Sequence, residues 1–285
     1  MFNRISKNGI MVKKILWVGA LCLPALAATA QDNDYESDFG TWWELGAKKE
    51  LTKQWSVSLE GELRTNDMDK EVDRLGLGLG AVYKVNKYLK VGAGYTLNGL
   101  HKQEKVKTKG EYNILGELEG EVRIRTTPGY WSHRHRFYID VTPGIKLGKA
   151  WHLSLRERYQ YSFTPLHHHT RDTRYYEVFD GEWDLDSEVL GERITDERVH
   201  RHVLRSRIKL EYDKKKVDWK PFVSVEAQNN LTEHMHMRKL RASAGTEYKI
   251  NRHHSAGLAY VFTLANEGGD KELFHALNIS YNFKF

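Results

Sequence analysis

Hydrophobic and polar residues alternate along most of the chain, and the alternation is clearest near its end. From Leu273 to Phe285 most odd-numbered positions are apolar or aromatic, whereas Asn278, Ser280 and Asn282 occupy even-numbered positions. A period of two residues places successive side chains on opposite faces of a strand, so the two faces must meet different environments. The segment 272–285 is therefore predicted to be a β-strand.

Ten similar runs precede this segment, and no helical period of comparable strength follows residue 30. In each run, apolar residues share one face while polar residues or glycines share the other. The expected strands lie near 43–47, 55–63, 75–83, 89–97, 131–147, 151–163, 201–212, 219–228, 238–250, 254–264 and 272–285.

The connections between these runs are alternately short and long. The short ones are 51–54, 85–88, 147–150, 213–218 and 250–253, and the long polar ones are 65–71, 99–130, 164–200, 229–237 and 265–271. Outer-membrane barrels combine short periplasmic turns and long extracellular loops with strands that alternate apolar-out and polar-in. The pattern predicts an all-β protein, a transmembrane antiparallel up-and-down β-barrel.

The expected strand number is ten to twelve, with twelve favoured. Bacterial barrels of this kind normally have an even number of strands, whereas the alternating runs number eleven. A twelfth strand could come from residues 33–40, or the segment 111–126 could change the count.

The first 30 residues have the features of a secretory signal peptide. Lys13 and Lys14 precede the apolar stretch "ILWVGALCLPALA", and the small residues Ala28 and Ala30 provide a cleavage site. Cys22, the only cysteine, lies inside this segment. We therefore expect a signal peptide at 1–30 and one barrel domain at 31–285, located in the bacterial outer membrane. Its partners would be the membrane lipid and the barrel assembly machinery.

The formal net charge of +6 gives no argument for nucleic-acid binding. Four of the positive charges, on Arg4, Lys7, Lys13 and Lys14, belong to the expected signal peptide. The remaining chain has a net charge of about +2 with both signs intermixed, whereas nucleic-acid binding favours clusters of positive charge.

Four segments, "HRFYIDV", "LSLRERYQY", "RSRIKLEYD" and "YKINRHHSAGLAY", resemble a family of secreted proteins from Gram-negative bacteria that is described as a domain of unknown function. The resemblance extends from about Asp38 to Phe285 and is weakest at 170–198, which looks like a variable insertion. It implies an outer-membrane β-barrel. The family has no assigned activity, so the resemblance implies no catalytic residue.

Charged residues on the polar faces are the main candidates for function. These are Arg134, Arg136, Arg156, Arg158, Arg205, Arg207, Lys209, Arg241, Glu60, Glu62, Asp140, Glu211, Glu226 and Glu247. Such residues can pair across strands and, because the lumen of a small barrel is narrow, can largely fill it. The alternatives are a structural network in the lumen and a narrow charge-selective pore for small solutes.

Glu157 breaks the alternation because it falls on the apolar face of the run 151–163. A carboxylate facing lipid near mid-depth is costly. Either a β-bulge beside Arg156 turns Glu157 inward, or a contact between protomers covers it.

Histidine pairs spaced two residues apart could share a metal ion, since positions i and i+2 of a strand share a face. The weak candidates are His167, His168, His169, His234 and His236. No third ligand or supporting shell is identifiable, so neither a metal nor another cofactor is expected.

An enzymatic activity is not expected. Lipid-modifying barrels use a Ser and His on the apolar face, and here only Ser206 beside His202 comes near that arrangement. We therefore expect a non-enzymatic outer-membrane barrel with a charge-filled lumen and a structural or surface-interaction role. The alternatives are the narrow pore and, less favoured, a lipid-modifying enzyme.

Two further features bear on the partners. The charged and aromatic loop 164–198 could cover the barrel mouth or meet an extracellular ligand, and a pore would instead pass a small solute. Phe285 resembles the terminal aromatic residue of outer-membrane barrels, so it is expected to serve as the assembly signal.

Overall fold

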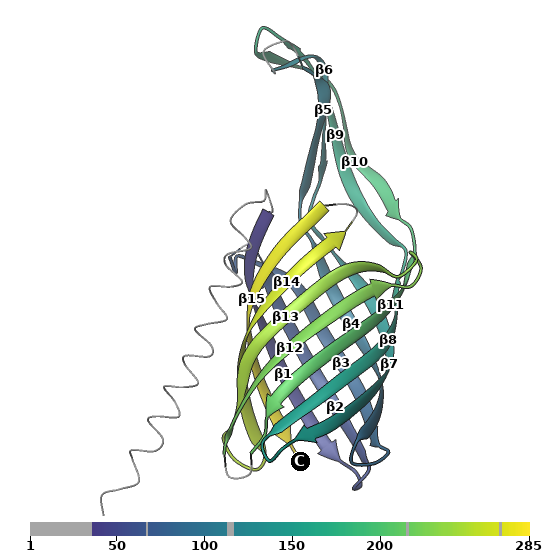
Figure 1. The fold of residues 1–285 in the computed structure, drawn as a ribbon. Coiled ribbons are helices and arrows are strands. Elements are labelled where there is room, and N and C mark those ends of the chain that lie inside the picture. Colours follow the sequence, from purple (N-terminus) through teal and green to yellow (C-terminus); the bar gives the residue numbers. More distant parts are fainter. Residues whose placement is uncertain (1–35, 67, 113–116, 215–216, 268–269) are drawn as a thin grey trace, which may run out of the picture.

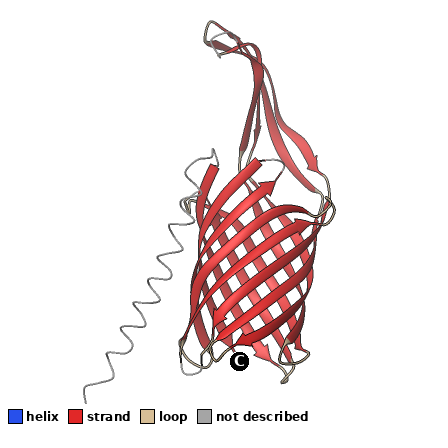
Figure 2. Cartoon of the chain, viewed as in Figure 1, coloured by secondary structure: helices blue, strands red, loops and turns tan. Residues whose placement is uncertain are grey.

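The computed structural model describes residues 36–285 except 67, 113–116, 215–216 and 268–269. The expected signal peptide, 1–30, lies outside the described residues. Every regular element of the described chain is a strand (Figures 1 and 2). No helix in this part of the chain is long and apolar enough to cross a membrane. The strands are β1 (Glu36–Glu50), β2 (Trp55–Asn66), β3 (Glu71–Lys84), β4 (Leu89–Lys102), β5 (Lys105–Tyr112), β6 (Leu118–Thr127), β7 (Tyr130–Leu147), β8 (Trp151–Thr164), β9 (His167–Phe179), β10 (Glu182–Asp196), β11 (Val199–Tyr212), β12 (Trp219–Asn230), β13 (His236–Lys249), β14 (His254–Glu267) and β15 (Asp270–Lys284).

Eleven strands close into a barrel in the order β1-β15-β14-β13-β12-β11-β8-β7-β4-β3-β2. The all-β barrel expected from the sequence is confirmed, and eleven strands lie within the expected range of ten to twelve, although the favoured count of twelve is wrong. With an odd number of alternately directed strands, the first and last run the same way, so the closing pair must be parallel. β1 and β15 pair in parallel, with Trp42 opposite Asn278 and Glu44 opposite Ser280. Neither 33–40 nor 111–126 supplies a twelfth strand among the described residues.

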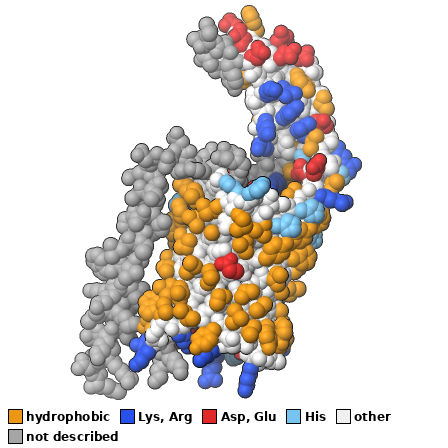
Figure 3. All heavy atoms as spheres, turned by 45° about the vertical axis from the view of Figure 1, so that its right-hand side comes forward, with side chains coloured by type: hydrophobic (Ala, Val, Ile, Leu, Met, Phe, Trp, Pro, Cys, Tyr) orange, Lys and Arg blue, Asp and Glu red, His pale blue; other side chains and the backbone are white. Residues whose placement is uncertain are grey.

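The barrel has its apolar side chains outside and its polar side chains inside. Leu77, Val225 and Leu258 are 57%, 52% and 50% exposed on the outer wall. In the lumen, by contrast, Asn98 and Glu226 are buried. Figure 3 shows a nearly continuous apolar wall that is interrupted by an isolated acidic group. The alternation in the sequence therefore corresponds to an apolar exterior and a polar interior of the barrel.

A small apolar cluster lies inside the lumen at the parallel seam. Trp42 of β1, Val261 of β14 and Ala276 of β15 are buried together, and Phe274 stacks on Trp42 with ring centroids 6.0 Å apart. A Cβ atom at Gly40 would lie 2.1 Å from the backbone oxygen of Thr65. Only glycine therefore allows β1 to approach so closely here.

The strands β5, β6, β9 and β10 form a second sheet, in the order β10-β9-β6-β5, which we call the extension. It projects beyond one end of the barrel (Figure 1). The sequence pattern predicts long polar connections at 99–130 and 164–200. That prediction is wrong, because these segments contain the four strands of the extension. The barrel is continuous beneath it, because Lys102 pairs with Tyr130 and Thr164 pairs with Val199.

Candidate functional site

The lumen contains a cavity of about 310 Å³ in the middle of the barrel. Its wall combines side chains from opposite sides of the barrel and is dominated by arginine. The charged lining residues are Glu44, Glu60, Glu62, Arg64, Arg136, Arg156, Arg158, Arg205, Arg207, Glu226 and Arg241.

Glu226 of β12 is the centre of the largest ion-pair group. Its carboxylate oxygens lie 2.6 Å from Arg156 Nη2, 2.7 Å from Arg205 Nη2 and 3.9 Å from Arg241 Nη1. The three arginines come from β8, β11 and β13, and the Glu226 side chain is only 4% exposed. Removing one partner of a buried ion pair leaves an uncompensated charge, so this group ties four strands together.

Two smaller groups accompany it, one on the neighbouring strands β7 and β8 and one on β2, across the barrel. Asp140 of β7 accepts hydrogen bonds from Arg158 Nε and Nη2 at 3.0 and 2.6 Å. The Arg158 guanidinium also lies 3.8 Å from the ring centroid of Tyr138. Glu62 of β2 accepts a hydrogen bond of 2.7 Å from Arg64. These charge-assisted contacts fix the guanidinium groups in position.

Trp42 connects the seam to the charged groups. The guanidinium carbons of Arg64 and Arg241 lie 3.8 and 4.7 Å from its ring, close enough for cation–π contacts. The sequence reasoning missed Trp42, Glu44 and Arg64 as lumen residues. Trp42 could have been found, because it shares the inward, even-numbered positions of β1 with Glu44.

Most of the lumen residues predicted from sequence come together. Arg136, Arg156, Arg158, Arg205, Arg207, Arg241, Glu60 and Glu62 line the cavity, and Asp140 binds Arg158. Arg134 and Glu211 do not reach it. Arg134 donates to Thr164 Oγ1 at 3.2 Å, and Glu211 pairs with Lys209.

Glu157 faces outward. Leu155 and Tyr159, the outward residues on either side of it, are each 38% exposed, and the pairing of β8 with β11 is continuous past Glu157. The bulge that could have turned Glu157 inward is therefore not present. Instead, Ser206 Oγ donates a hydrogen bond of 2.6 Å to Glu157 Oε2. A covering contact between protomers stays a prediction.

The serine and histidine considered for lipid chemistry have separate partners. Ser206 is bound to Glu157, while His202 Nδ1 lies 2.7 Å from Tyr159 Oη. A nucleophile needs its base within hydrogen-bonding reach. The geometry therefore gives no support to a Ser–His pair at this place.

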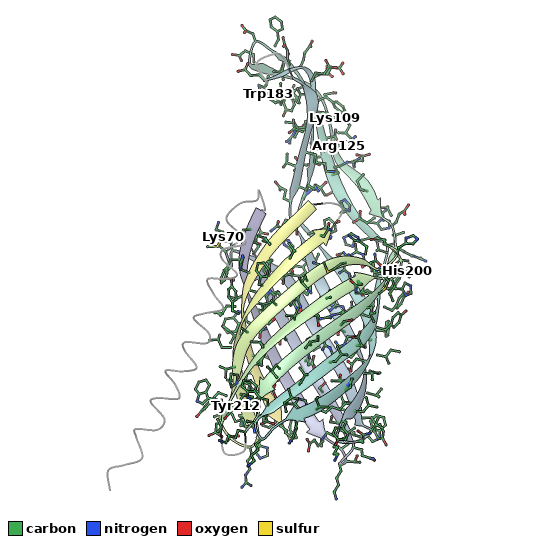
Figure 4. The ribbon with its side chains drawn as sticks, viewed as in Figure 1. Lys70, Lys109, Arg125, Trp183, His200 and Tyr212 are labelled. Atoms are coloured by element: carbon green, nitrogen blue, oxygen red, sulfur yellow. The ribbon has the colours of Figure 1, made fainter. Side chains whose placement is uncertain are left out.

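Several histidines pair with tyrosines on the outer wall. The Tyr95–His135, Tyr159–His202 and Tyr161–His200 pairs each join a tyrosine oxygen to an imidazole Nδ1 at 2.7 Å. Figure 4 shows His200 near the extension, and Tyr212 at the opposite end of β11. These contacts satisfy polar atoms on an otherwise apolar surface.

Of the histidines considered for metal binding, His167 and His169 lie together, with ring centroids 6.5 Å apart, whereas His168 and His236 have other partners. His167 and His169 stack on Tyr130, with ring centroids 4.8 and 4.5 Å away, and His168 contacts Thr195. His236, the first residue of β13, lies beside Asn266 of β14, with 3.4 Å between His236 Nε2 and Asn266 Nδ2. No group of three or more His, Cys, Asp or Glu residues among the described residues could hold a metal ion.

Tyr130 itself is fixed at the base of the extension, above the apolar wall. Its hydroxyl donates a hydrogen bond of 2.6 Å to Asp196 Oδ2. Burial, together with this hydrogen bond and the charge of Asp196, raises the pKa of Tyr130 to about 12. The contact stabilises the neutral phenol and anchors the extension to the barrel.

Phe285 lies at the end of the parallel seam. Its backbone N–H donates to the Lys48 carbonyl oxygen at 2.9 Å, and its side chain is 62% exposed. The ring packs edge-on against Phe283, with centroids 4.4 Å apart. A part for Phe285 in assembly stays a prediction.

Residues 39–273 match the family described as "Protein of unknown function (DUF2490)", so the chain belongs to that family. No curated protein matches the chain.

Proposed function

We propose that this member of the DUF2490 family is a non-enzymatic β-barrel of the bacterial outer membrane, with a structural or surface-interaction role. The observation that carries the proposal is the inverted distribution of side chains. Large apolar residues remain exposed on the outer wall, as Leu77, Ile139 and Ile208 do at 57% each. Soluble monomers rarely expose apolar patches larger than a few hundred Å², whereas a lipid-facing wall requires one.

Aromatic residues at the end opposite the extension support this orientation. Trp55, Tyr88, Trp151 and Trp219 are between 45% and 53% exposed beside the short turns. Tryptophan and tyrosine favour the interface between lipid and water. The short turns would then face the periplasm and the extension would project from the cell. The expected signal peptide at 1–30 would direct the chain out of the cytoplasm. The barrel assembly machinery would then insert it into the outer membrane, with Phe285 as the assembly signal.

The lumen favours a closed barrel over an open channel. Glu226 connects β8, β11, β12 and β13 through its three arginine contacts, and Arg64 and Arg241 both contact Trp42. Long side chains held in this way occupy the cross-section of a small barrel.

The extension favours a surface-interaction role. Phe179, Trp183 and Leu190 are 76%, 47% and 55% exposed on strands that would lie outside the membrane. Exposed aromatic and aliphatic groups of this kind are typical of contact surfaces. An extracellular ligand is therefore a candidate partner.

Cell fractionation and gel electrophoresis test the membrane assignment. The protein should be recovered with the outer membrane after carbonate and salt washing, and unheated samples should migrate differently from boiled ones. Release of the intact protein by washing would overturn the proposal, because that result is expected for a soluble periplasmic protein.

A narrow charge-selective pore is a second candidate, and the cavity of about 310 Å³ favours it. Rings of charged side chains can set ion preference. Planar bilayer recordings separate the two functions. Folded protein without single-channel steps agrees with a closed lumen, whereas steps whose ion preference changes in Arg156→Ala or Arg205→Ala would establish a pore. The third possibility, a lipid-modifying enzyme, has no support from the separated Ser206 and His202.

A further inference from the structure

The cavity in the lumen contains more positive than negative side chains. Seven arginines and four glutamates line it, and Asp140 adds a fifth carboxylate through its contact with Arg158. The imbalance is concentrated on two side chains. Neither Arg136 nor Arg207 forms an ion pair or a side-chain hydrogen bond with the described part of the chain, although both line the cavity.

Four arginines form a compact array on the inner faces of β8 and β11. Arg158 lies directly opposite Arg205, and Arg156 lies directly opposite Arg207. Like charges directly opposite each other in a sheet destabilise it. Asp140 and Glu226 form ion pairs with three members of the array. Arg207 lies opposite Glu226 across β11 and β12 but forms no ion pair with the described residues, and both Glu226 oxygens are bound by other arginines.

Arg136 of β7, the strand next to β8, extends this array toward Arg74 of β3 and Arg64 of β2. It interacts electrostatically with the guanidinium groups of Arg74, Arg205 and Arg64, and with one acid, Glu62. The Nε atoms of Arg136, Arg156 and Arg207 are all buried without a hydrogen-bond partner. A buried charge is costly unless it is paired and hydrogen-bonded.

We infer that this cavity is a binding site for a small oxyanion with phosphate or carboxylate oxygens, held mainly by Arg136 and Arg207. Guanidinium groups present paired N–H donors that match these anions, and their planar forks can bind two oxygens at once. The volume, about 310 Å³, lies at the lower end of the range for small-molecule sites. An anion here would offset the excess charge and satisfy the unpaired donors. The inference concerns the lumen alone and does not depend on the surface-interaction role.

Thermal unfolding of the barrel in detergent micelles tests the site. The protein is refolded in chloride, inorganic phosphate or succinate at equal ionic strength and pH, so that the cavity can fill during folding. Phosphate or succinate should raise Tm saturably above the chloride value, because a ligand that binds only the folded state stabilises it. Whichever anion gives the larger shift identifies the preferred oxygen chemistry.

Two variants and a matched control locate the effect. Arg136→Gln and Arg207→Gln should each weaken anion binding at least tenfold. In chloride they should melt no lower than wild type, because neither substitution breaks an ion pair. Lys107→Gln removes the same charge from the extension, and should leave both the anion affinity and the Tm in chloride unchanged. Isothermal titration of the wild-type barrel with phosphate and succinate provides a measurement that needs no variant.

Several results would overturn the inference. One is the absence of saturable heat in the wild-type titrations with both anions. Another is equal Tm in all three salts. A third is unchanged anion binding in both arginine variants. None of these results bears on membrane location or conductance, so failure of this site is distinguishable from failure of the proposed function.

Discussion

The barrel and the extension are both antiparallel sheets, apart from one parallel seam in the barrel. They differ in whether their edge strands are paired and in which side chains their outer faces expose. Every barrel strand has two neighbours, whereas β5 and β10 each leave one edge of the extension open. The barrel presents an apolar wall to its surroundings and keeps its charges in the lumen. Nearly every residue of β10, charged or apolar, is exposed. The same backbone pattern therefore serves two environments, and an equivalent substitution should have unequal effects in the two sheets.

The largest difference is expected for the loss of an acidic partner. Glu226→Gln leaves Arg156 and Arg205 without their main counter-ion in the lumen, and should destabilise the barrel by about 3–5 kcal/mol. Glu188→Gln removes a pair with Arg174 in which both side chains are more than 40% exposed, and should cost about 0–1 kcal/mol. Urea unfolding in lipid vesicles measures both. Equal losses would show that the lumen network contributes no more than a surface pair.

A positive charge should be the next most damaging change. Leu77→Arg puts a guanidinium on the middle of the outer wall, and should cost about 2–4 kcal/mol if that wall faces lipid. Leu185→Arg, at a similarly exposed position of the extension, should change stability by about 0.5 kcal/mol or less. The folded fraction of each variant can be read from heat-modifiable migration. A tolerated Leu77→Arg would argue against a lipid-facing wall.

Glu157 provides a smaller and more local test. Ser206→Ala removes the hydroxyl that donates to its carboxylate, and should destabilise the barrel by about 1–3 kcal/mol because the acceptor is left on an apolar surface. Glu157→Gln removes the charge and should be neutral or stabilising in vesicles. A loss of stability in Glu157→Gln that depends on protein concentration would instead reveal the contact between protomers.

Removal of the extension should have the smallest effect on the barrel. Residues 103–129 and 166–197 are replaced with short turns. This change keeps Lys102 paired with Tyr130 and Thr164 paired with Val199, so every barrel strand keeps its neighbours. The barrel should retain heat-modifiable migration, with a change in Tm of only a few degrees. Failure of this variant to fold, when a control with the native segments folds, would show that the two sheets form one cooperative unit.

The contrast between the sheets also explains what could be predicted from the sequence. Runs such as 75–83 and 219–228 were recognisable as strands because their two faces meet different environments. The extension was missed since water reaches much of both its faces, as the exposed Asp184 and Leu185 of β10 illustrate. The alternating runs number eleven, as the barrel strands do, and twelve was favoured only because barrels of this kind normally have an even number of strands.

The lumen was predictable in composition but not in geometry. Alternation placed Arg156, Arg205 and Glu226 on inward faces, and the structure brings them together. The alternation could not identify which charges lack an ion-pair partner, because contacts between side chains of β8 and β12 depend on the curvature of the barrel and on side-chain length. That Arg207 forms no ion pair with Glu226, its partner in the strand register, is visible only in three dimensions.

Site-directed spin labelling tests the central claim, that the apolar wall faces lipid, most directly. Cys22 is the only cysteine and lies in the expected signal peptide, so single cysteines can be introduced without a competing thiol. In lipid vesicles, nitroxides at Ile208, Val223 and Val225 should be accessible to oxygen and protected from a water-soluble nickel chelate, whereas a label at Ser224 should be shielded from oxygen. Labels at the three apolar positions that react preferentially with the chelate would contradict the account.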